Sequence, residues 1–418
     1  MPGQGVAYTT YSSGHLLNVV ARNMSALPDH PSDFVEWLHR REEYRHLGTP
    51  EINQLYAPRT LYGIYLRNKL DELKNKFPLR FTIVPERIIG CRLLNGSIEL
   101  TSSTGKQLVF DKVVLATGNF LPGKPKGIPQ SFTSSTNYFN DPWSEKSVSN
   151  LSGELPVLIV GTGLTMVDVV IGISEKRKDQ KIIAISPKGF EILSHKQYEH
   201  QPAILDDLKP PYQLDELVRL FRSHLRAVWK LGITGETVVD AIRSKTQEIW
   251  TSLTPTERKR FLSHLRHLWG LARHRLPEGI HSIIRQLRQR GQLIVLAGRI
   301  IDVHEDSNSI AVTYQERSTK NIRELQVSRV INCTGPQTNV ERLTDPLFID
   351  LLKNGIVQPD PLGMGISCDL KGHPIDSTGS SIKKILAIGS LLKGDLWEST
   401  AVPELRAQAS AAAKELFS

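Results

Sequence analysis

Cysteine is scarce in this chain of 418 residues, and the few cysteines are isolated. Cys91, Cys333 and Cys368 are far apart, odd in number and without a C-x-x-C pair. This pattern argues against a disulfide framework, a zinc knuckle and a dithiol redox centre. It favours a reducing compartment, so we expect a cytoplasmic protein. A chain of this length can bury a large core without cross-links.

Low-complexity segments are also missing, and we expect no leader. Hydrophobic residues are 39% and charged residues 23% of the chain, which excludes collagen-like and disordered classes. The start, MPGQGVAYTT, has neither the basic nor the apolar part of a signal peptide. The most apolar window, residues 155–173, contains Asp168 and three glycines, so it predicts a strand, a turn and a helix. We therefore expect no membrane partner.

Positive charge is concentrated in one part of the chain. The net charge is +9, and residues 209–300 hold 17 Lys and Arg against 7 Asp and Glu. These basic residues alternate with Leu, Trp and Ile at helical spacing, so many should lie on a solvated helix face. An anionic cofactor or substrate is one alternative partner, and nucleic acid is a less supported one.

Two stretches of the chain, residues 79–118 and 292–335, resemble one another. Each begins with an extended apolar strand ending in Arg-Ile-Ile, continues through short alternating segments, and closes on a β-branched run into Thr-Gly. This predicts one unit used twice, a small antiparallel meander that returns into a strand of a parallel sheet. Chance similarity between two β meanders is the alternative.

Between these stretches, residues 156–190 predict a βαβ unit. A strand over 157–160 leads through a glycine turn into a helix over about 164–176, and a second strand covers 181–186. Residues 213–290 then show repeated Leu and Trp spacing and almost no strand signal. This predicts an inserted helical subdomain.

The turn Gly161-Thr162-Gly163 follows a strand and opens a helix, as in a dinucleotide fingerprint. The first glycine allows the tight turn, and the second lets backbone approach a pyrophosphate at the positive helix end. Met166 stands where the fingerprint has a third small residue. We expect nucleotide binding here, and a tight turn without a ligand is the alternative. The candidate residues are Gly161, Thr162, Gly163, Leu164, Thr165 and Asp168.

The end of the second strand bears on the choice between NADPH and NADH. An NAD-binding unit has an acidic residue there. Here the strand ends in Ser186-Pro187-Lys188, and the next carboxylate is Glu191. Ser186 and Lys188 can hold a 2′-phosphate, which favours NADPH over NADH. An exposed turn is the alternative.

The C-terminal run predicts a strand over 385–388, a loop, and a last helix over about 402–417. Free N–H groups at the start of that helix can face the pyrimidine end of a flavin and stabilise negative charge there. A capped helix packed on the core is the alternative.

Glycines follow three of the expected strands. The tripeptides Ala116-Thr117-Gly118 and Cys333-Thr334-Gly335 each end a buried-type strand after a meander. They look like the ATG-type crossover of flavoproteins with two dinucleotide-binding domains, where glycine lets backbone approach the cofactor. Gly118, Gly335 and Gly389 are therefore candidate cofactor contacts.

Common catalytic motifs are missing, with no HExxH, GxSxG or Walker A sequence. His195 and His200 can in principle bind a metal, but surface or cofactor-facing histidines are commoner, so we expect no metal. The cluster Arg273-His274-Arg275 can clamp a carboxylate or phosphate. A solvated helix end is the alternative for that cluster.

On these residues the chain resembles a family of FAD/NAD(P)-binding proteins whose characterised relatives include flavin-dependent urate hydroxylase and amino-acid N-monooxygenases. The matching stretches span nearly the whole chain. They are GQGVAYTTYSSGHLLNVVARNMSALPDHPSDFVEWL (3–38), LATGN (115–119), GTGLTMVD (161–168), RHRLPE (273–278), INCTGP (331–336) and LWESTAVPELRAQA (396–409).

The resemblance implies an α/β fold with two Rossmann-like dinucleotide-binding domains, small antiparallel meanders and an inserted helical subdomain. The implied parts are FAD-binding residues 1–120 and 331–418, a linker over 121–155, NAD(P)-binding residues 156–200 and 291–330, and a helical insertion over 201–290. Relatives begin with a strand and a GxGxxG loop that grips the FAD pyrophosphate. Here Met1 comes just before Gly3-Gln4-Gly5. We therefore expect the first βαβ unit to be missing, with neighbouring strand edges exposed. A start codon placed too late, a fragment of a longer protein and a genuine loss of FAD binding are the three alternatives.

The resemblance also implies an NAD(P)H-dependent flavin monooxygenase. NADPH would reduce FAD, the reduced flavin would react with O2, and a small polar substrate would be hydroxylated. Thr400 and Ala401 would lie under the pyrimidine ring, Asn18 near the flavin, Trp397 in the wall of the site, and Arg273 near the substrate. A flavin oxidoreductase without oxygenation and a non-enzymatic nucleotide-binding protein are the alternatives.

Overall fold

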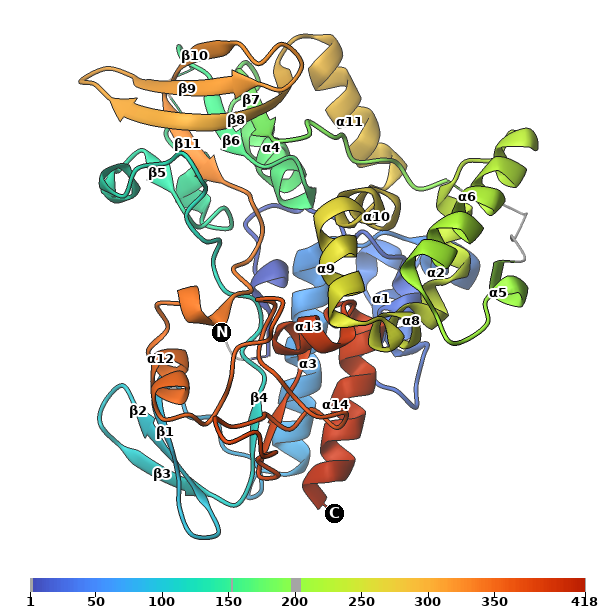
Figure 1. The fold of residues 1–418 in the computed structure, drawn as a ribbon, viewed down its shortest axis with the longest axis vertical. Coiled ribbons are helices and arrows are strands. Elements are labelled where there is room, and N and C mark those ends of the chain that lie inside the picture. The colour runs from blue at the N-terminus through green and yellow to red at the C-terminus, as the bar shows by residue number, and fades with distance from the viewer. Residues whose placement is uncertain (1–2, 152, 197–203, 418) are drawn as a thin grey trace.

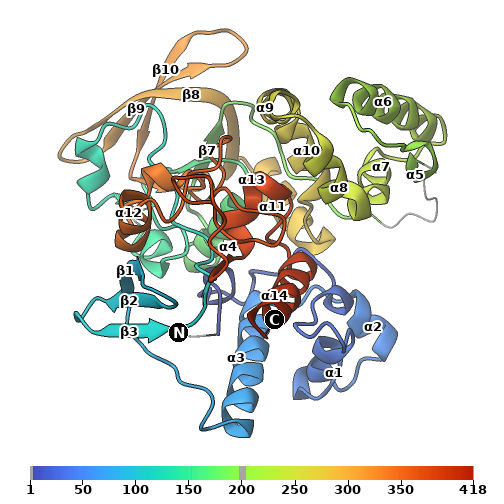
Figure 2. The same ribbon diagram turned by 60° about the horizontal axis from the view of Figure 1, so that its bottom comes forward.

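The computed structural model describes residues 3–151, 153–196 and 204–417. Figure 1 shows three parts. A large sheet with its helices forms the upper part, two small sheets and two long helices form the lower part, and a helical subdomain projects to one side. The same division is clear after the turn of view in Figure 2. Among the described residues, no helix has the length and apolar character needed to cross a membrane.

The upper part is built on a seven-stranded mixed sheet. Its order is β10-β9-β8-β7-β6-β11-β5. The strands are β5 (Tyr138–Phe139), β6 (Val157–Val160), β7 (Ile182–Ser186), β8 (Leu293–Glu305), β9 (Ile310–Glu316), β10 (Ile322–Val327) and β11 (Arg329–Asn332). The long strand β8 joins two regions, because its first half pairs with β7 in parallel and its second half pairs with β9 antiparallel.

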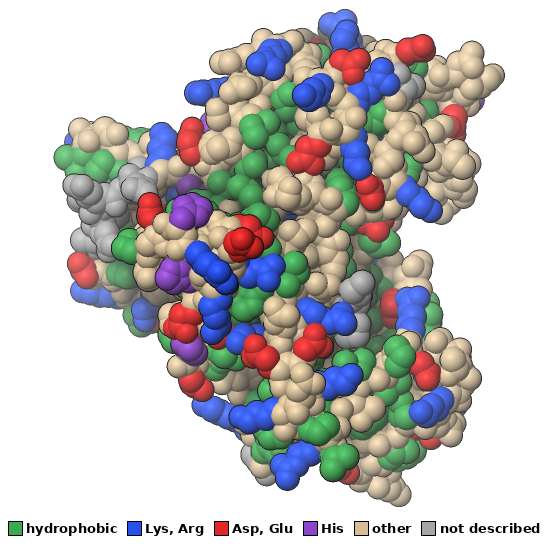
Figure 3. All heavy atoms as spheres, turned by 180° about the vertical axis from the view of Figure 1, so that it is seen from behind, with side chains coloured by type: hydrophobic (Ala, Val, Ile, Leu, Met, Phe, Trp, Pro, Cys, Tyr) green, Lys and Arg blue, Asp and Glu red, His purple; other side chains and the backbone are tan. Residues whose placement is uncertain are grey.

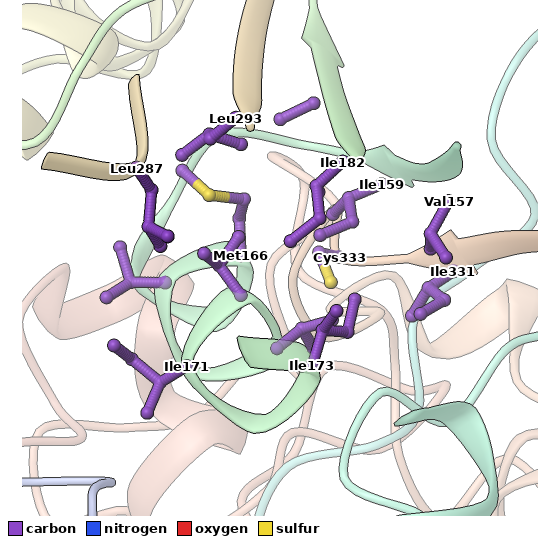
Figure 4. Close-up of a cluster of buried hydrophobic side chains, with 14 of the residues drawn as sticks. Val157, Ile159, Met166, Ile171, Ile173, Ile182, Leu287, Leu293, Ile331 and Cys333 are labelled. Atoms are coloured by element: carbon purple, nitrogen blue, oxygen red, sulfur yellow. The ribbon is translucent and has the colours of Figure 1, made fainter. Parts of the chain in front are cut away.

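The central strands are buried on both faces, which explains their continuous apolar sequences. Every residue of β6 and β11 is buried. Helices α4 (Leu164–Lys176) and α11 (Glu278–Gln289) pack on one face, where Met166, Leu287 and Ile182 meet (Figure 4). Side chains from β8, β9 and β11 form the core on the other face with Phe132. The βαβ unit has the bounds expected from the sequence to within one residue.

The helical subdomain interrupts the chain between β7 and α11. Its helices are α5 (Ile204–Asp207), α6 (Leu214–Lys230), α7 (Glu236–Ala241), α8 (Thr246–Ser252), α9 (Pro255–His264) and α10 (Arg266–Arg273). They enclose a core of their own around Trp250, which stacks on Trp397 with ring centroids 5.1 Å apart. The expected helical insertion is confirmed, but it ends at Arg273, because α11, which was expected within it, packs on the large sheet.

The lower part contains the first meander and the C-terminal helix. Its strands are β1 (Ile88–Leu93), β2 (Ile98–Ser102), β3 (Gln107–Phe110), β4 (Val113–Leu115) and β12 (Ile385–Ala387), and its helices are α1 (Asp33–His39), α2 (Thr49–Gln54), α3 (Arg59–Lys76), α12 (Pro346–Lys353), α13 (Lys393–Leu396) and α14 (Val402–Phe417). The meander β1-β2-β3 packs on α12, and β4 pairs with β12 in parallel. Helices α3 and α14 lie side by side in Figures 1 and 2.

Short 3₁₀ turns connect these elements. They cover Val6–Tyr8, Ala21–Asn23, Glu42–Tyr44, Ser131–Ser134, Glu145–Val148, Arg243–Lys245, Val340–Arg342 and Gly389–Leu392.

The two similar stretches differ in how their strands pair. In the first, residues 79–86 are not a strand, and Leu79 is 98% exposed, so the expected apolar strand is wrong there. In the second, all three strands of the meander, β8, β9 and β10, belong to the large sheet. Both copies end, as expected, in a strand of a parallel pair, β4 and β11.

The parts of the fold also meet at different places from those expected. Strand β5 lies within the expected linker but pairs with β11 at the edge of the large sheet. Ile331 and Asn332 pair with β6, so the second part of the lower domain begins after β11.

Candidate functional site

The turn between β6 and α4 is pressed against the end of β11. Gly161 has a φ of +116°, and a Cβ there would lie 2.3 Å from the carbonyl oxygen of Cys333. Glycine is required at this position for two reasons, because the conformation strains other residues and the neighbouring backbone leaves no room. The turn therefore brings the start of α4 beside the loop that follows β11.

The start of α4 faces open space. Gly163 is its N-cap, no side chain of the described residues caps the helix, and an added Cβ would meet none of their heavy atoms within 4 Å. The same holds for a Cβ added at Gly335, which has a φ of +90°. Leu164 and Thr165 follow in the first turn and are half-buried. An uncapped helix start with open glycines fits the pyrophosphate of a dinucleotide.

The end of β7 lies beside this turn and carries positive charge. The Ser186 hydroxyl is 3.0 Å from that of Thr162 and accepts the N–H of Gly189 at 2.9 Å. Lys188 is exposed, and its carbonyl accepts a hydrogen bond of 3.3 Å from Arg317. Arg317 has no local sequence signal, because it follows β9 in the chain and reaches the site only through the sheet.

Asp168 faces away from the open space. Its carboxylate is 2.9 Å from the Arg59 guanidinium, and both side chains are at most 10% exposed. His15 donates from Nε2 to the backbone carbonyl of Asp168 at 2.8 Å. Burial raises the pKa of Asp168 to about 6, although Arg59 opposes this shift, and burial lowers the pKa of His15 to about 4. Asp168 thus joins α4 to the start of α3, in place of the expected contact with a cofactor.

The ends of β4 and β12 lie next to the start of α14. Gly118 has a φ of +71°, is exposed, and accepts a hydrogen bond from the Ser390 hydroxyl at its carbonyl. Gly389 has a φ of +74° and donates its N–H to the side chain of Gln408 on α14 at 2.7 Å. These contacts bring two of the expected glycines to one place in the lower part.

The loop before α14 divides into a buried and an open half. Trp397 is 9% exposed, has a φ of +61°, and packs into the core of the helical subdomain. Ser399 is fully buried, and its hydroxyl has no partner within the described part of the chain. Thr400 is exposed and Ala401 is half-buried. Only the second half, with the helix start, is open to a flavin ring.

Arg273 is held by a carboxylate of the chain itself. Its Nε and Nη2 donate to the two oxygens of Glu398 at 2.9 and 3.0 Å, and Trp269 donates to the same carboxylate at 2.9 Å. The ion pair lowers the pKa of Glu398 and raises the pKa of Arg273, against the effect of burial on each. The planar fork of Arg273 therefore anchors the helical subdomain on the loop before α14. This contact takes the place of the expected contact with a substrate.

Asn18 lies where three distant segments meet. Its carbonyl accepts a hydrogen bond of 2.9 Å from Nε2 of His195, whose ring stacks on Tyr56 at 5.2 Å. Burial lowers the pKa of His195, and the positive charge of Arg275 adds to this effect. Tyr56 and the contact of His195 with Asn18 were not foreseen, because they depend on folding alone. His200 lies outside the described residues.

The expected residues thus fall into two groups. The turn of α4, Ser186 and Lys188 lie in the upper part, with Gly335 beside them, while Gly118, Gly389, Thr400 and Ala401 lie in the lower part.

The residues on the flavin side of the site fit FAD only in part. The sequence Gly3-Gln4-Gly5 lies against α3, since a Cβ at Gly3 would be 2.8 Å from Leu70, and the described residues before β1 form no strand beyond a single bridge. They therefore offer no glycine turn for the FAD pyrophosphate.

Comparison with known families finds a match to part of the chain. The family described as FAD-NAD(P)-binding matches residues 1–120. No curated protein matches the chain.

Several solved structures share the fold over nearly the whole chain. Ornithine hydroxylase from Pseudomonas aeruginosa has a TM-score of 0.65 and 12% identity, covering 99% of this chain and 90% of its own. Ornithine N-hydroxylase from Kutzneria sp. 744, solved with reduced FAD, NADP⁺ and L-ornithine, has a TM-score of 0.64 and 13% identity, covering 96% and 87%. The FAD-bound cadaverine monooxygenase of Erwinia amylovora has a TM-score of 0.66 and 11% identity, covering 99% and 86%. The fold is therefore that of flavin-dependent monooxygenases with two dinucleotide-binding domains.

Proposed function

We propose that the chain is a cytoplasmic NADPH-dependent flavoprotein that hydroxylates a small polar substrate with O2. Two findings support this proposal, namely the FAD-NAD(P)-binding match in the N-terminal region and the fold of flavin monooxygenases. The observation that carries the proposal is the open start of α4. Its uncapped backbone and the outward-facing Gly163 and Gly335 form a cradle that an anionic dinucleotide would fill.

On this proposal the upper part holds NADPH. Gly161, Gly163 and the backbone of Leu164 and Thr165 hold the pyrophosphate. Three polar side chains at the end of β7 hold the 2′-phosphate, namely Ser186, Lys188 and Arg317. Their positive charge favours NADPH over NADH. Glu191, the next carboxylate after β7, forms an ion pair with Arg288, which also favours NADPH.

The lower part takes the flavin ring. Thr400, Ala401 and the positive start of α14 would lie against the pyrimidine side, where they would stabilise negative charge. Gly118 and Gly389 let backbone approach from the strand ends. Bound FAD and NADPH would supply the electron transfer and the activation of O2.

The rest of the chain positions the site and keeps water out. The Trp397 ring stacks on Trp250 and meets Phe261 edge-on at 5.2 Å, which closes the helical subdomain over the loop before α14. The Glu398–Arg273 pair fixes the same contact. His195 holds the backbone of Asn18, whose side chain is half-buried.

A nucleotide-binding protein without catalysis is the second candidate. One observation favours it, because the open start of α4 would bind a dinucleotide whether or not a flavin is present. The purified full chain distinguishes the two. A flavin absorption spectrum, with NADPH oxidation that rises with one compound and yields its hydroxylated product, supports the enzyme. NADPH binding by a colourless chain that takes up no added FAD supports the second candidate.

The role of the α4 turn is tested with two glycine variants. In Gly163→Ala the new methyl group enters the space reserved for the pyrophosphate, so NADPH affinity should fall by about tenfold or more, the equivalent of one charge-assisted hydrogen bond. The melting temperature should not fall, because that methyl group meets no protein atom. Gly279→Ala, at the start of α11, is the matched control. It should leave NADPH affinity unchanged, and its melting temperature should not fall, because alanine is the better helix former. Equal NADPH affinity of Gly163→Ala and the wild type would contradict the proposal.

A further inference from the structure

Helix α6 carries a basic stripe that has no function in the proposed reaction. Arg222, Arg226 and Lys230 follow one another at four-residue spacing, so they lie on one side of the helix, and all are exposed. Within the described part of the chain, none of the three forms an ion pair, although other exposed arginines such as Arg260 do. The stripe therefore presents three uncompensated charges to the surroundings.

Two large apolar side chains stand at the end of this stripe. Trp229 is 60% exposed and Leu231 is 63% exposed. Trp229 comes seven residues after Arg222, so it lies on the same side of the helix two turns later. Single exposed apolar residues are common on protein surfaces. An exposed Trp and Leu at the end of an unpaired basic stripe form a more specific arrangement.

The other side of α6 is fully used. Leu214, Leu217 and Val228 are buried in the core of the helical subdomain. The basic side is therefore free to meet a partner without disturbing the fold. Seen from behind, the helical subdomain is the protrusion at the left of Figure 3, where basic and hydrophobic side chains both reach the surface.

We propose that this basic and apolar side of α6 docks on an anionic lipid surface. A Trp beside lysines and arginines is the composition that binds the interface of a bilayer, where the indole sits at the headgroup level and the cations meet anionic headgroups. The helix is about 25 Å long and would lie flat on the surface. Aliphatic Leu231 favours lipid over nucleic acid, because it can enter the acyl boundary but cannot stack on a base as an aromatic ring does.

This contact goes beyond the proposed function and does not depend on it. It also differs from the expectation, drawn from the sequence, that the chain has no membrane partner, because docking needs no membrane-spanning helix. Helix α6 projects from the side of the molecule away from the β6–α4 turn (Figures 1 and 2). Docking would therefore bring the protein to a membrane while the candidate site stays accessible.

Vesicle sedimentation of the full chain tests the proposal. The probes are vesicles of phosphatidylcholine alone and of phosphatidylcholine mixed with phosphatidylglycerol. We expect binding to the mixed vesicles only, weakened by salt. Each cation near an anionic surface contributes about fivefold to binding, so Arg222→Gln with Arg226→Gln should weaken binding about 25-fold. The matched control, Arg290→Gln with Arg323→Gln, removes the same charge from exposed positions elsewhere and should bind as the wild type does.

The apolar contribution is tested separately. Trp229→Ala should weaken binding, whereas Leu370→Ala, at a fully exposed loop position, should not. Brominated lipids should quench the fluorescence of the wild type, and Trp229→Phe should bind but lose that quenching. Unchanged circular dichroism melting shows that each variant is folded.

Three results would overturn the proposal. One is equal sedimentation with neutral and anionic vesicles, and another is equal binding by the two arginine double variants. The third is the absence of vesicle binding, combined with the loss of a different interaction in Trp229→Ala or in the Arg222/Arg226 variant. That interaction is either self-association, measured by light scattering, or binding to a single-stranded oligonucleotide. That result would assign the surface to a second copy or to nucleic acid.

Discussion

The ion pair between Arg273 and Glu398 should contribute much more to stability than an ordinary surface pair. It joins α10 of the helical subdomain to the loop before α14, through two hydrogen bonds from the guanidinium and a third from Trp269. The two side chains are 11% and 18% exposed, so solvent screens them weakly. Replacing one partner leaves a poorly solvated charge without its counterion.

The magnitude follows from this burial. Removing one partner of a buried pair costs about 3–5 kcal/mol, and exposed pairs contribute less than about 1 kcal/mol. Because the side chains of Arg273 and Glu398 are slightly exposed, we take the lower end of this range and expect Glu398→Gln to lower the free energy of unfolding by about 3 kcal/mol. A double-mutant cycle of Glu398→Gln with Arg273→Met should give a coupling energy of about 2 kcal/mol.

The pair between Arg260 and Asp215 is the matched control. It has the same two-fold geometry, with distances of 3.2 and 2.8 Å, but its side chains are 50% and 67% exposed. Asp215→Asn should leave the stability unchanged in chemical denaturation. A coupling energy for Arg273 and Glu398 no larger than that of the exposed pair would refute the reasoning that burial sets the contribution.

The pH dependence gives a second measurement. The pKa of Glu398 is lowered from its ordinary value of 4.5, with Arg273 the main favourable contact. Its contribution is therefore fully present above pH 4.5 and is lost as the pH falls through the lower value of the folded protein. The difference in stability between the wild type and Glu398→Gln should shrink below pH 4.5. A difference that stays constant would contradict the charged state of Glu398.

Three further predictions concern the region around α4. Burial lowers the pKa of His15 from 6.5 to about 4, so between about pH 6.5 and pH 4 the unfolded chain binds a proton that the folded chain does not bind. As the pH falls through this range, the wild type should lose about 3 kcal/mol more stability than His15→Gln. Equal losses would contradict a neutral His15 ring in the folded protein. Gly161→Ala should destabilise the fold by roughly 2 kcal/mol or more in denaturant titration, because its Cβ would meet the Cys333 carbonyl at positive φ; unchanged stability would show that the turn can shift. Lys188→Ala with Arg317→Ala should weaken NADPH binding in fluorescence titration by about tenfold or more while NADH binding stays within about twofold, and parallel losses would exclude a 2′-phosphate contact.

The sequence predicted elements whose signals are local. The helix expected over about 164–176 is α4, Leu164–Lys176. It was predictable because a buried apolar strand leads into a glycine turn, and the turn starts the helix. The last helix and the helical insertion were recognised for similar reasons. The strand expected at residues 79–86 was wrong, because an apolar run becomes a strand only where another strand pairs with it, and β1 begins at Ile88.

The roles of charged residues could not be predicted in the same way. Asp168 stands in a fingerprint position, yet Arg59 takes its carboxylate. Arg273 stands in a cationic cluster, yet Glu398, 125 residues away, occupies its fork. Arg317 joins Lys188 across 129 residues. A charged side chain gives the same local signal whether it faces a ligand or a partner elsewhere in the chain.

By itself, then, the sequence determined the fold class, the βαβ unit with its glycine turn, and the positions of the inserted and final helices. These depend on periodicity and backbone conformation within a few neighbouring residues. Only the tertiary structure decided which expected side chains face open space and which are held inside the protein. That choice depends on contacts between residues more than a hundred positions apart, which the order of residues along the chain does not record.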